Sequence, residues 1–207
     1  MSPRIENPEA RKDKETVIFD AACRVIREKG FHQARMADIA AAAGISYGLV
    51  YHYYKSKSDL FDALSDQWWD PLEALVQRLV EEDRPVKEKL LAVADYHLDQ
   101  FQERPDLVHV FIMEISRSTS NLTPERLGRF KKLMALIEIM MTKAQAEGSI
   151  RKDLRPRYLT YFFLGSLETF LSTMVLDNQP LGSKSQKKRL AEAVVTIFFE
   201  GAGPNGA

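Results

Sequence analysis

Tyrosine, histidine and lysine side chains gather between Tyr47 and Lys57, and these residue types suit contact with DNA. A tyrosine offers an apolar ring for a thymine methyl group and a hydroxyl for a phosphate, and a lysine offers a cation for phosphate. Helical spacing turns Val50 and Tyr54 toward a core. The opposite face then carries Tyr47, Gly48, Leu49, Tyr51 and His52, with Lys55 and Lys57 at the helix exit.

Gly48 is unusual near the start of an exposed helix, because glycine costs about 1 kcal/mol relative to alanine there. A glycine at this point makes sense if another backbone must approach closely. The competing interpretation is a tightly packed three-helix unit whose surface aromatic residues meet another domain.

Short helices separated by glycines must position this face. The spacing predicts a helix over 14–29 that stops at Gly30, and a second over 36–43 that stops at Gly44. Ser46 can cap a third helix over 47–54. A fourth helix opens near Lys57 with Ser58 as a candidate cap, and Pro71 is expected to kink or end it.

The remaining sequence also has helical spacing, and no convincing period-two strand is found. We expect helices over 72–82, 86–102, 105–117, 124–148, 156–177 and 184–201. Thr123 followed by Pro124 is a strong start signal for the helix that begins there. The pattern predicts an all-α protein of about nine helices, with an N-terminal three-helix helix-turn-helix unit and a larger C-terminal helical domain.

Composition limits the function classes. The 207 residues are 45% hydrophobic and carry 29 basic and 29 acidic side chains, so any attraction to nucleic acid must be local. Residues 1–57 hold ten Lys and Arg against seven Asp and Glu, a modest net +3. Cys23 suits a small buried hydrophobe. No secretory signal follows Met1, and the apolar stretch 158–176 contains polar residues that argue against a membrane span, so we expect a cytoplasmic protein.

The stretch GFHQARMADIAAAAGISYGLVYHYYKSKSDL, from Gly30 to Leu60, closely resembles the DNA-binding signature of the TetR/AcrR family of bacterial regulators. The resemblance implies a homodimer in which each helix-turn-helix reads half of a near-palindromic operator. Carried over by position, the residues facing bases or sugar are Tyr47, Gly48, Leu49 and Tyr51. Those touching phosphate are His52, Tyr53 and Lys57, while Ser46 caps the recognition helix and Lys55 occupies a variable position.

Two departures from the family pattern affect recognition. Ala37 stands where many relatives have an arginine that contacts a base, so part of that reading is missing. Arg35 replaces the usual Ser or Thr cap, which removes an acceptor but adds a cation near phosphate. The arm with Arg4, Arg11, Lys12 and Lys14 either contacts DNA or is simply a solvated tail.

The expected organisation is a flexible basic arm at 1–13, the DNA-binding domain at 14–60, a ligand-binding and dimerisation domain at 61–202, and a disordered tail at 203–207. The helix over 156–177 is apolar on more than one face, which favours burial on two sides. In the family the last two helices pair with their copies as a four-helix bundle. The candidate dimer residues are Phe162, Leu167, Phe170, Met174, Val194, Ile197 and Phe198.

The central helices supply phenylalanine and methionine side chains that can adapt around an apolar ligand, although an ordinary core has the same composition. The candidate ligand residues are Phe101, Val108, Phe111, Ile112, Ile115, Met134, Ile137 and Met141. The segment GSIRKDLRPRYLTYFFLGSLETFLSTMV is similar in style to family repressors of fatty-acid degradation that respond to long-chain acyl-CoA. Its phosphates would need cations, with candidates at Arg104, Arg117, Arg126, Arg129, Lys131 and Lys132.

Catalysis is disfavoured, because the histidines lack metal-ligand spacing and no glycine-rich phosphate loop or G-x-S-x-G motif is present. We expect no cofactor and no metal. The sequence therefore favours a dimeric, ligand-responsive transcriptional repressor. Its expected partners are double-stranded operator DNA and a small inducer, and no membrane partner is expected. The alternative is a helical adaptor that binds protein and not DNA.

Overall fold

The computed structural model describes residues 8–116, 123–177 and 180–202, and over these ranges it contains nine α-helices, a π-helical segment and no strand. The expected all-α fold is confirmed. The helices are α1 (Pro8–Lys29), α2 (Met36–Ala43), α3 (Tyr47–Tyr53), α4 (Lys57–Glu81), α5 (Val86–Glu103), α6 (Pro105–Val110), the π-helical η1 (Phe111–Ser116), α7 (Pro124–Ala146), α8 (Pro156–Leu176) and α9 (Lys184–Ala202).

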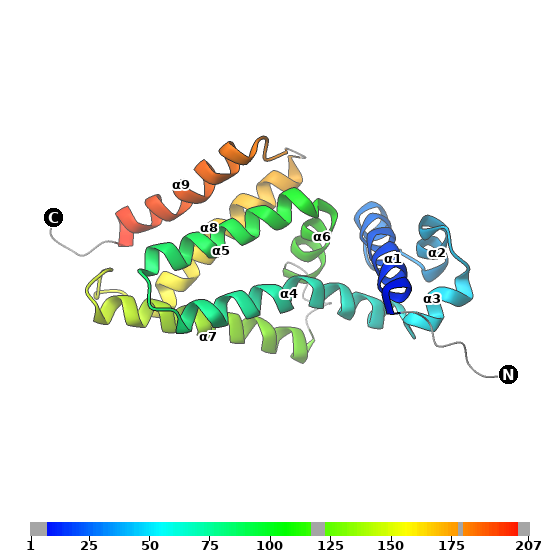
Figure 1. Ribbon diagram of the computed structural model, residues 1–207, viewed down its shortest axis with the longest axis horizontal. Coiled ribbons are helices and arrows are strands. Elements are labelled where there is room, and N and C mark those ends of the chain that lie inside the picture. Colours follow the sequence, from blue (N-terminus) through cyan, green and yellow to red (C-terminus); the bar gives the residue numbers. More distant parts are fainter. Residues whose placement is uncertain (1–7, 117–122, 178–179, 203–207) are drawn as a thin grey trace.

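Helices α1 to α3 form a small unit at one end of the molecule (Figure 1). Its core gathers aliphatic and aromatic side chains from these helices and the start of α4, including Ile18, Ile39, Val50 and Phe61. Leu107 of α6 belongs to the same cluster. The small unit therefore packs directly against the larger helical bundle.

Helix α4 runs from the small unit into the bundle without a break (Figure 1). Ser58 is not its cap, because Ser56 accepts the N–H of Asp59 at 3.0 Å, and the helix does not end at Pro71, which lies inside it. Apolar side chains at helical spacing bury on both sides of the proline, including Leu64, Trp68 and Leu72. This burial outweighs the single backbone hydrogen bond that a proline removes.

The boundaries of the expected domains need correction at two points. Helix α1 begins at Pro8, so Arg11, Lys12 and Lys14 belong to a helix and not to a flexible arm, and Arg11 pairs with Glu15. The boundary drawn at 60–61 falls inside α4. The remaining arm residues, Arg4 among them, and the tail 203–207 lie outside the described residues.

The bundle core lies among α4, α5, α7, α8 and α9, which surround buried residues such as Leu98, Ile137 and Phe163. Helix α8 has the length and hydropathy of a membrane-spanning segment. The polar residues within it were expected to exclude a span, but by composition alone they do not. A third of its most apolar window is buried in the bundle.

Candidate DNA-reading face and ligand cavity

Helix α3 is fixed at its start by local geometry and along one face by burial. Gly44 takes the left-handed conformation at φ 67°, which a side chain would strain, and so permits the sharp turn out of α2. Ser46 Oγ accepts the N–H of Leu49 at 3.3 Å, as expected for a cap. Val50 is fully buried and Tyr54 nearly so, which confirms the face that holds α3 to its unit.

The outer face of α3 presents two large aromatic side chains to solvent. Tyr47 is 54% exposed and Tyr51 is 40% exposed, and their ring centroids lie 4.8 Å apart. A side-chain hydrogen bond with Tyr47 raises the pKa of the Tyr51 hydroxyl. The two rings therefore form one apolar shelf with hydroxyls at its edge. His52 beside them is exposed, whereas Leu49 and Tyr53 are half-buried.

Gly48 has no internal reason to be a glycine. A Cβ placed there would meet no heavy atom of the chain within 4 Å, and its φ is not in the left-handed range. Alanine would therefore fit and would favour the helix. The packing and backbone of the chain therefore do not explain this glycine, and the expectation that another backbone approaches here is carried into the proposal below.

Lys57 does not have the geometry expected of a phosphate-binding lysine. Its ammonium group donates to the carbonyl oxygens of Phe31, His32 and Ala34 at 2.6, 3.0 and 3.0 Å. The same group lies 4.6 Å from the centroid of the Phe31 ring. All three ammonium donors are used to tie the turn between α1 and α2 to α4. Lys55 is exposed, and its backbone N–H donates to a carboxylate oxygen of Asp59 at 2.8 Å.

Arg35 is exposed at the start of α2 and, as expected, its side chain makes no cap hydrogen bond, whereas Asp38 binds back to this turn. One carboxylate oxygen of Asp38 accepts the N–H of Arg35 at 3.1 Å, and the other pairs with Lys29 at 3.1 Å. The hydrogen bond from Lys29 is the main reason that the pKa of Asp38 is lowered. Asp38, the third residue of α2, therefore satisfies the backbone N–H of Arg35, as the third helical residue of a capping box does.

An apolar cavity of about 210 Å³ lies between α4, α5, η1, α7 and α8. Three predicted ligand residues line it, namely Phe111, Ile112 and Met134. Other predicted residues lie elsewhere: Val108, Ile137 and Met141 are packed in the core, and Phe101 borders a second cavity near α1. The side chain of Ile115 lies outside the described residues.

Helix α4 contributes a wall of the cavity that the sequence analysis did not predict. This wall consists of Trp68, Trp69 and Leu72. Trp68 stacks on Phe111 with centroids 4.4 Å apart. The signal was present in the helical spacing from Leu64 through Trp68 to Leu72, which continues across the proline. The other lining residues are His97, Arg126, Leu127, Phe130, Leu133, Leu164, Glu168 and Leu171.

Few polar groups reach this cavity, and each has a distinct chemical character. Arg126, a cationic residue, lines it although its side chain is only 6% exposed. His97 Nδ1 lies 2.7 Å from the carbonyl oxygen of Val93, so Nδ1 donates and Nε2 is left as an acceptor. Burial lowers the pKa of His97, which keeps the ring neutral. Glu168 is exposed at the rim.

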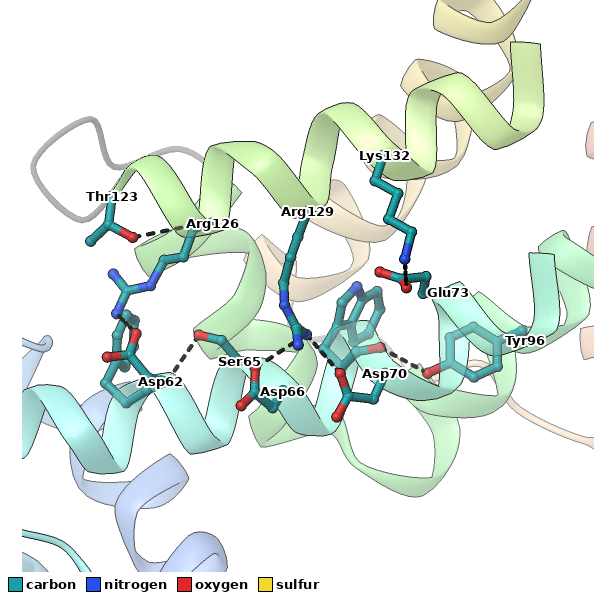
Figure 2. A network of polar contacts seen from close by, with 12 residues as sticks. Asp62, Ser65, Asp66, Asp70, Glu73, Tyr96, Thr123, Arg126, Arg129 and Lys132 are labelled. Atoms are coloured by element: carbon teal, nitrogen blue, oxygen red, sulfur yellow. Dashed lines mark hydrogen bonds and ion pairs between the residues drawn. The ribbon is translucent and has the colours of Figure 1, made fainter. Parts of the chain in front are cut away.

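A row of ion pairs joins α7 to α4 beside the cavity (Figure 2). Arg126 meets Asp62 at 2.5 Å, and Arg129 meets Asp66 and Asp70 at 3.1 and 2.8 Å. Lys132 pairs with Glu73. Three of the six cations expected for a ligand phosphate are thus in ion pairs, and Arg104 donates to Gln67 at 3.3 Å. Lys131 is exposed, and Arg117 lies outside the described residues.

The candidate dimer face is largely open in the single chain. Phe162 of α8 is 61% exposed and Ile197 of α9 is 70% exposed. Together with Phe170, Val194 and Phe198 they line a groove of about 490 Å³. Met174 is half-buried. Leu167 is the exception: it is fully packed inside its own chain and cannot be an interface residue.

Across the described ranges, no group of three or more His, Cys, Asp or Glu residues is arranged to hold a metal ion. Cys23 is buried, as expected, and burial raises the pKa of its thiol to about 12. The chemistry of the molecule is therefore concentrated in the α3 face, the cavity and the α8–α9 face.

Residues 18–64 match the family described as bacterial regulatory proteins of the tetR family, and residues 70–201 match the C-terminal region of YsiA-like proteins. The chain is similar to the fatty acid metabolism regulator protein of Bacillus subtilis, with 25% identity over 191 residues, covering 92% of this chain and 96% of the relative.

Two solved structures extend the similarity to the fold. The fatty acid degradation regulator FadR from Bacillus halodurans superposes with a TM-score of 0.77 at 24% identity, covering 96% of this chain and 98% of that one. FadR from Bacillus subtilis in complex with stearoyl-CoA gives a TM-score of 0.69 at 25% identity, covering 90% and 98%.

Proposed function

Because the chain belongs to the TetR family of bacterial transcriptional regulators, we propose that it is a homodimeric repressor that binds a near-palindromic operator and is released by a long-chain fatty acyl-CoA. Its relatives are transcriptional regulators and not enzymes, and this sets aside the adaptor alternative. We place its work in the cytoplasm, where operator DNA lies, with no membrane partner.

The observation that carries the proposal is the combination of an outward aromatic face on a capped α3 with an apolar cavity, both reached by the single helix α4. On α3, Tyr47, Gly48 and Tyr51 are the residues assigned to base edges or sugar, with Leu49 beside them. His52, Tyr53, Arg35 and Lys55 are assigned to phosphate. Lys57 is reassigned to holding the turn together, because its donors are already used.

The dimer is supported by the exposed apolar side chains of α8 and α9. A monomer that left Phe162 and Ile197 in water would carry an apolar patch of the kind that marks an interface. Pairing two copies through these helices would place two α3 helices on one DNA duplex. Operator symmetry would then follow from the symmetry of the dimer.

A fatty acyl chain suits the cavity by chemistry more than by present size. The walls are aromatic and aliphatic, but about 210 Å³ is below the roughly 300–1,000 Å³ that ligand pockets usually offer. A long chain must therefore enlarge the space between α4 and α7. The relative bound to stearoyl-CoA supports this class of ligand.

DNA binding is tested with a fluorescent duplex taken from upstream of the gene for this chain. We expect a saturable rise in anisotropy that weakens steeply as salt increases. Tyr51→Ala should remove the preference for that duplex over a scrambled one while the protein keeps its thermal stability, because Tyr51 supports no core contact. Equal affinity for both duplexes in the unaltered protein would refute operator recognition.

A further inference from the structure

Arg126 is a buried cation in a mostly apolar cavity. Its side chain is 6% exposed, whereas Arg129 and Lys132 on the same helix are 33% and 53% exposed. A guanidinium taken out of water needs an anion within reach. Arg126 forms an ion pair with Asp62. The side chain of Asp62 is 54% exposed, so it gives up little hydration by pairing.

Asp62 belongs to the part of α4 that serves the DNA-binding unit. It lies between Leu60 and Leu64, which are both buried in the core of that unit. The guanidinium of Arg126 also lies 4.6 Å from the centroid of the Phe61 ring, and Phe61 contacts Phe31 with centroids 4.3 Å apart. Arg126 thus touches both the cavity and the core that positions α3.

We propose that Arg126 recognises an anionic group on the ligand, and that it exchanges Asp62 for this group when the cavity is filled. The inference rests on the proposed function, since it names the chemistry and coupling of the same cavity. The ligand class is an amphiphile with an anion joined to an apolar chain. A fatty carboxylate and the phosphates of an acyl-CoA share this chemistry.

The exchange weakens DNA binding for a physical reason. In the free protein the Asp62–Arg126 pair holds the start of α4 against α7, next to the core that carries α3. A ligand anion that takes over the guanidinium leaves Asp62 to solvent and removes that tie. Because binding and coupling are reciprocal, weakening the tie in advance must favour the ligand and disfavour the operator.

The other ion pairs of the row provide matched controls. Arg129 joins the same two helices through Asp66 and Asp70 but does not line the cavity (Figure 2). Substitutions at Arg126 or Asp62 and substitutions at Arg129 or Asp70 therefore all remove an ion pair between α4 and α7. Only the Arg126 set should change ligand recognition.

The experiment uses the full-length protein and three probes: palmitate, palmitoyl-CoA and hexadecanol. Dissociation constants are measured by calorimetry or fluorescence, and operator affinity by anisotropy. In the unaltered protein we expect at least one of the two anionic probes to bind about tenfold or more tightly than the neutral alcohol, since charge-assisted hydrogen bonds have this magnitude. Which one does so identifies the source of the anion.

Arg126→Gln should remove the preference for the anion, and Arg126→Lys should restore part of it. Asp62→Asn should bind the preferred probe more tightly and the free operator more weakly, a pair of opposite changes that general loss of structure does not produce. Arg129→Gln and Asp70→Asn should keep the preference of the unaltered protein. Circular dichroism verifies that each variant is folded.

Two results overturn the inference while leaving the proposed function intact. One is an Arg126→Gln protein that still prefers the anion, and the other is an Asp62→Asn protein whose probe affinity is unchanged or lower. If the unaltered protein binds the operator but none of the probes, the inference and the proposed ligand class both fail. If it does not bind the operator at all, the repressor proposal itself is wrong.

Discussion

Lys55 and Lys57 are two residues apart, yet their surroundings separate their roles. Lys57 is tied to three backbone carbonyls, while the Lys55 side chain is exposed beside the outer face of α3. Sequence reasoning treated both as cations for phosphate, because residue type and position along the chain do not reveal which carbonyl oxygens a fold brings near. The distinction is visible only in tertiary structure.

Replacing Lys57 by alanine should therefore lower the free energy of unfolding by about 1–2 kcal/mol, since a charged donor and three carbonyl partners lose their hydrogen bonds. Lys55→Ala should leave stability unchanged, weaken binding to every duplex and reduce the salt slope by about one. Denaturant unfolding and salt-dependent anisotropy measure the two effects. A reduced salt slope in a fully stable Lys57→Ala protein would return Lys57 to phosphate binding.

Gly48→Ala separates stability from DNA binding. The new methyl group has open space within the chain and should stabilise α3 by up to about 1 kcal/mol. The same methyl should obstruct the approach of DNA and weaken operator affinity. Melting temperature and anisotropy on the same preparation give both quantities. Unchanged affinity would mean that DNA does not come close to residue 48.

His97 makes stability depend on pH in a direction fixed by burial. Its pKa is below the ordinary 6.5 because the buried ring cannot easily become charged. In the unfolded chain the ring takes up a proton below about pH 6.5, whereas in the fold it stays neutral there. Acid therefore favours unfolding, and this part of the stability is present above pH 6.5 and declines as the pH falls through it.

Chemical unfolding at pH 7.5 and 5.5 measures the decline. His97→Gln should lower stability at pH 7.5 but show a shallower decline, and part of the decline should remain because desolvation also lowers the pKa of His109. His52→Gln, at an exposed site, is the control and should decline like the unaltered protein. A His97→Gln protein with the full decline would contradict this origin.

At the scale of helices, the sequence predicted most elements well because their signals are local. Ser46, Thr123 and Gly44 mark helix ends through hydrogen bonds or backbone conformation that need only neighbouring residues. The course of α4 past Pro71 was not predicted, because the burial that holds it comes from other helices. The cavity wall formed by Trp68 and Trp69 was not predicted either.

The π-helical turn at 111–116 was not predicted either, and it contacts both the cavity and the DNA-binding unit. Phe111 and Ile112 line the cavity, and Glu114 accepts the backbone N–H of Phe31 at 3.1 Å. The sequence does not reveal a π-helical turn, because the turn depends on the tertiary contacts of its side chains. Such turns are frequent at functional sites.

The exposed face of α8 gives a prediction for assembly. Phe162→Glu should yield monomers and weaken operator binding, because a charge cannot be buried without a partner and a half-site alone binds poorly. Ile139→Glu, an equally drastic change on the exposed side of α7, is the matched control and should remain dimeric. Light scattering reports the mass. A dimeric Phe162→Glu protein would place the interface elsewhere.

At the scale of the whole molecule, one helix links the two functional regions. Helix α4 begins in the core beneath α3, passes beside the cavity and ends in the bundle (Figure 1). Ion pairs and the shared apolar core join α4 to α7 along this course. If a long ligand enlarges the cavity by moving α4 against α7, as proposed above, we expect the continuous helix α4 to carry the change to the unit that holds α3.

The most direct test is operator affinity measured with and without saturating palmitoyl-CoA. Anisotropy of a labelled duplex at fixed salt gives both dissociation constants, and hexadecanol at the same concentration controls for nonspecific effects of an amphiphile. We predict that palmitoyl-CoA weakens operator binding by at least about tenfold, a coupling within the usual allosteric range. Tight palmitoyl-CoA binding with unchanged operator affinity would contradict a ligand-released repressor.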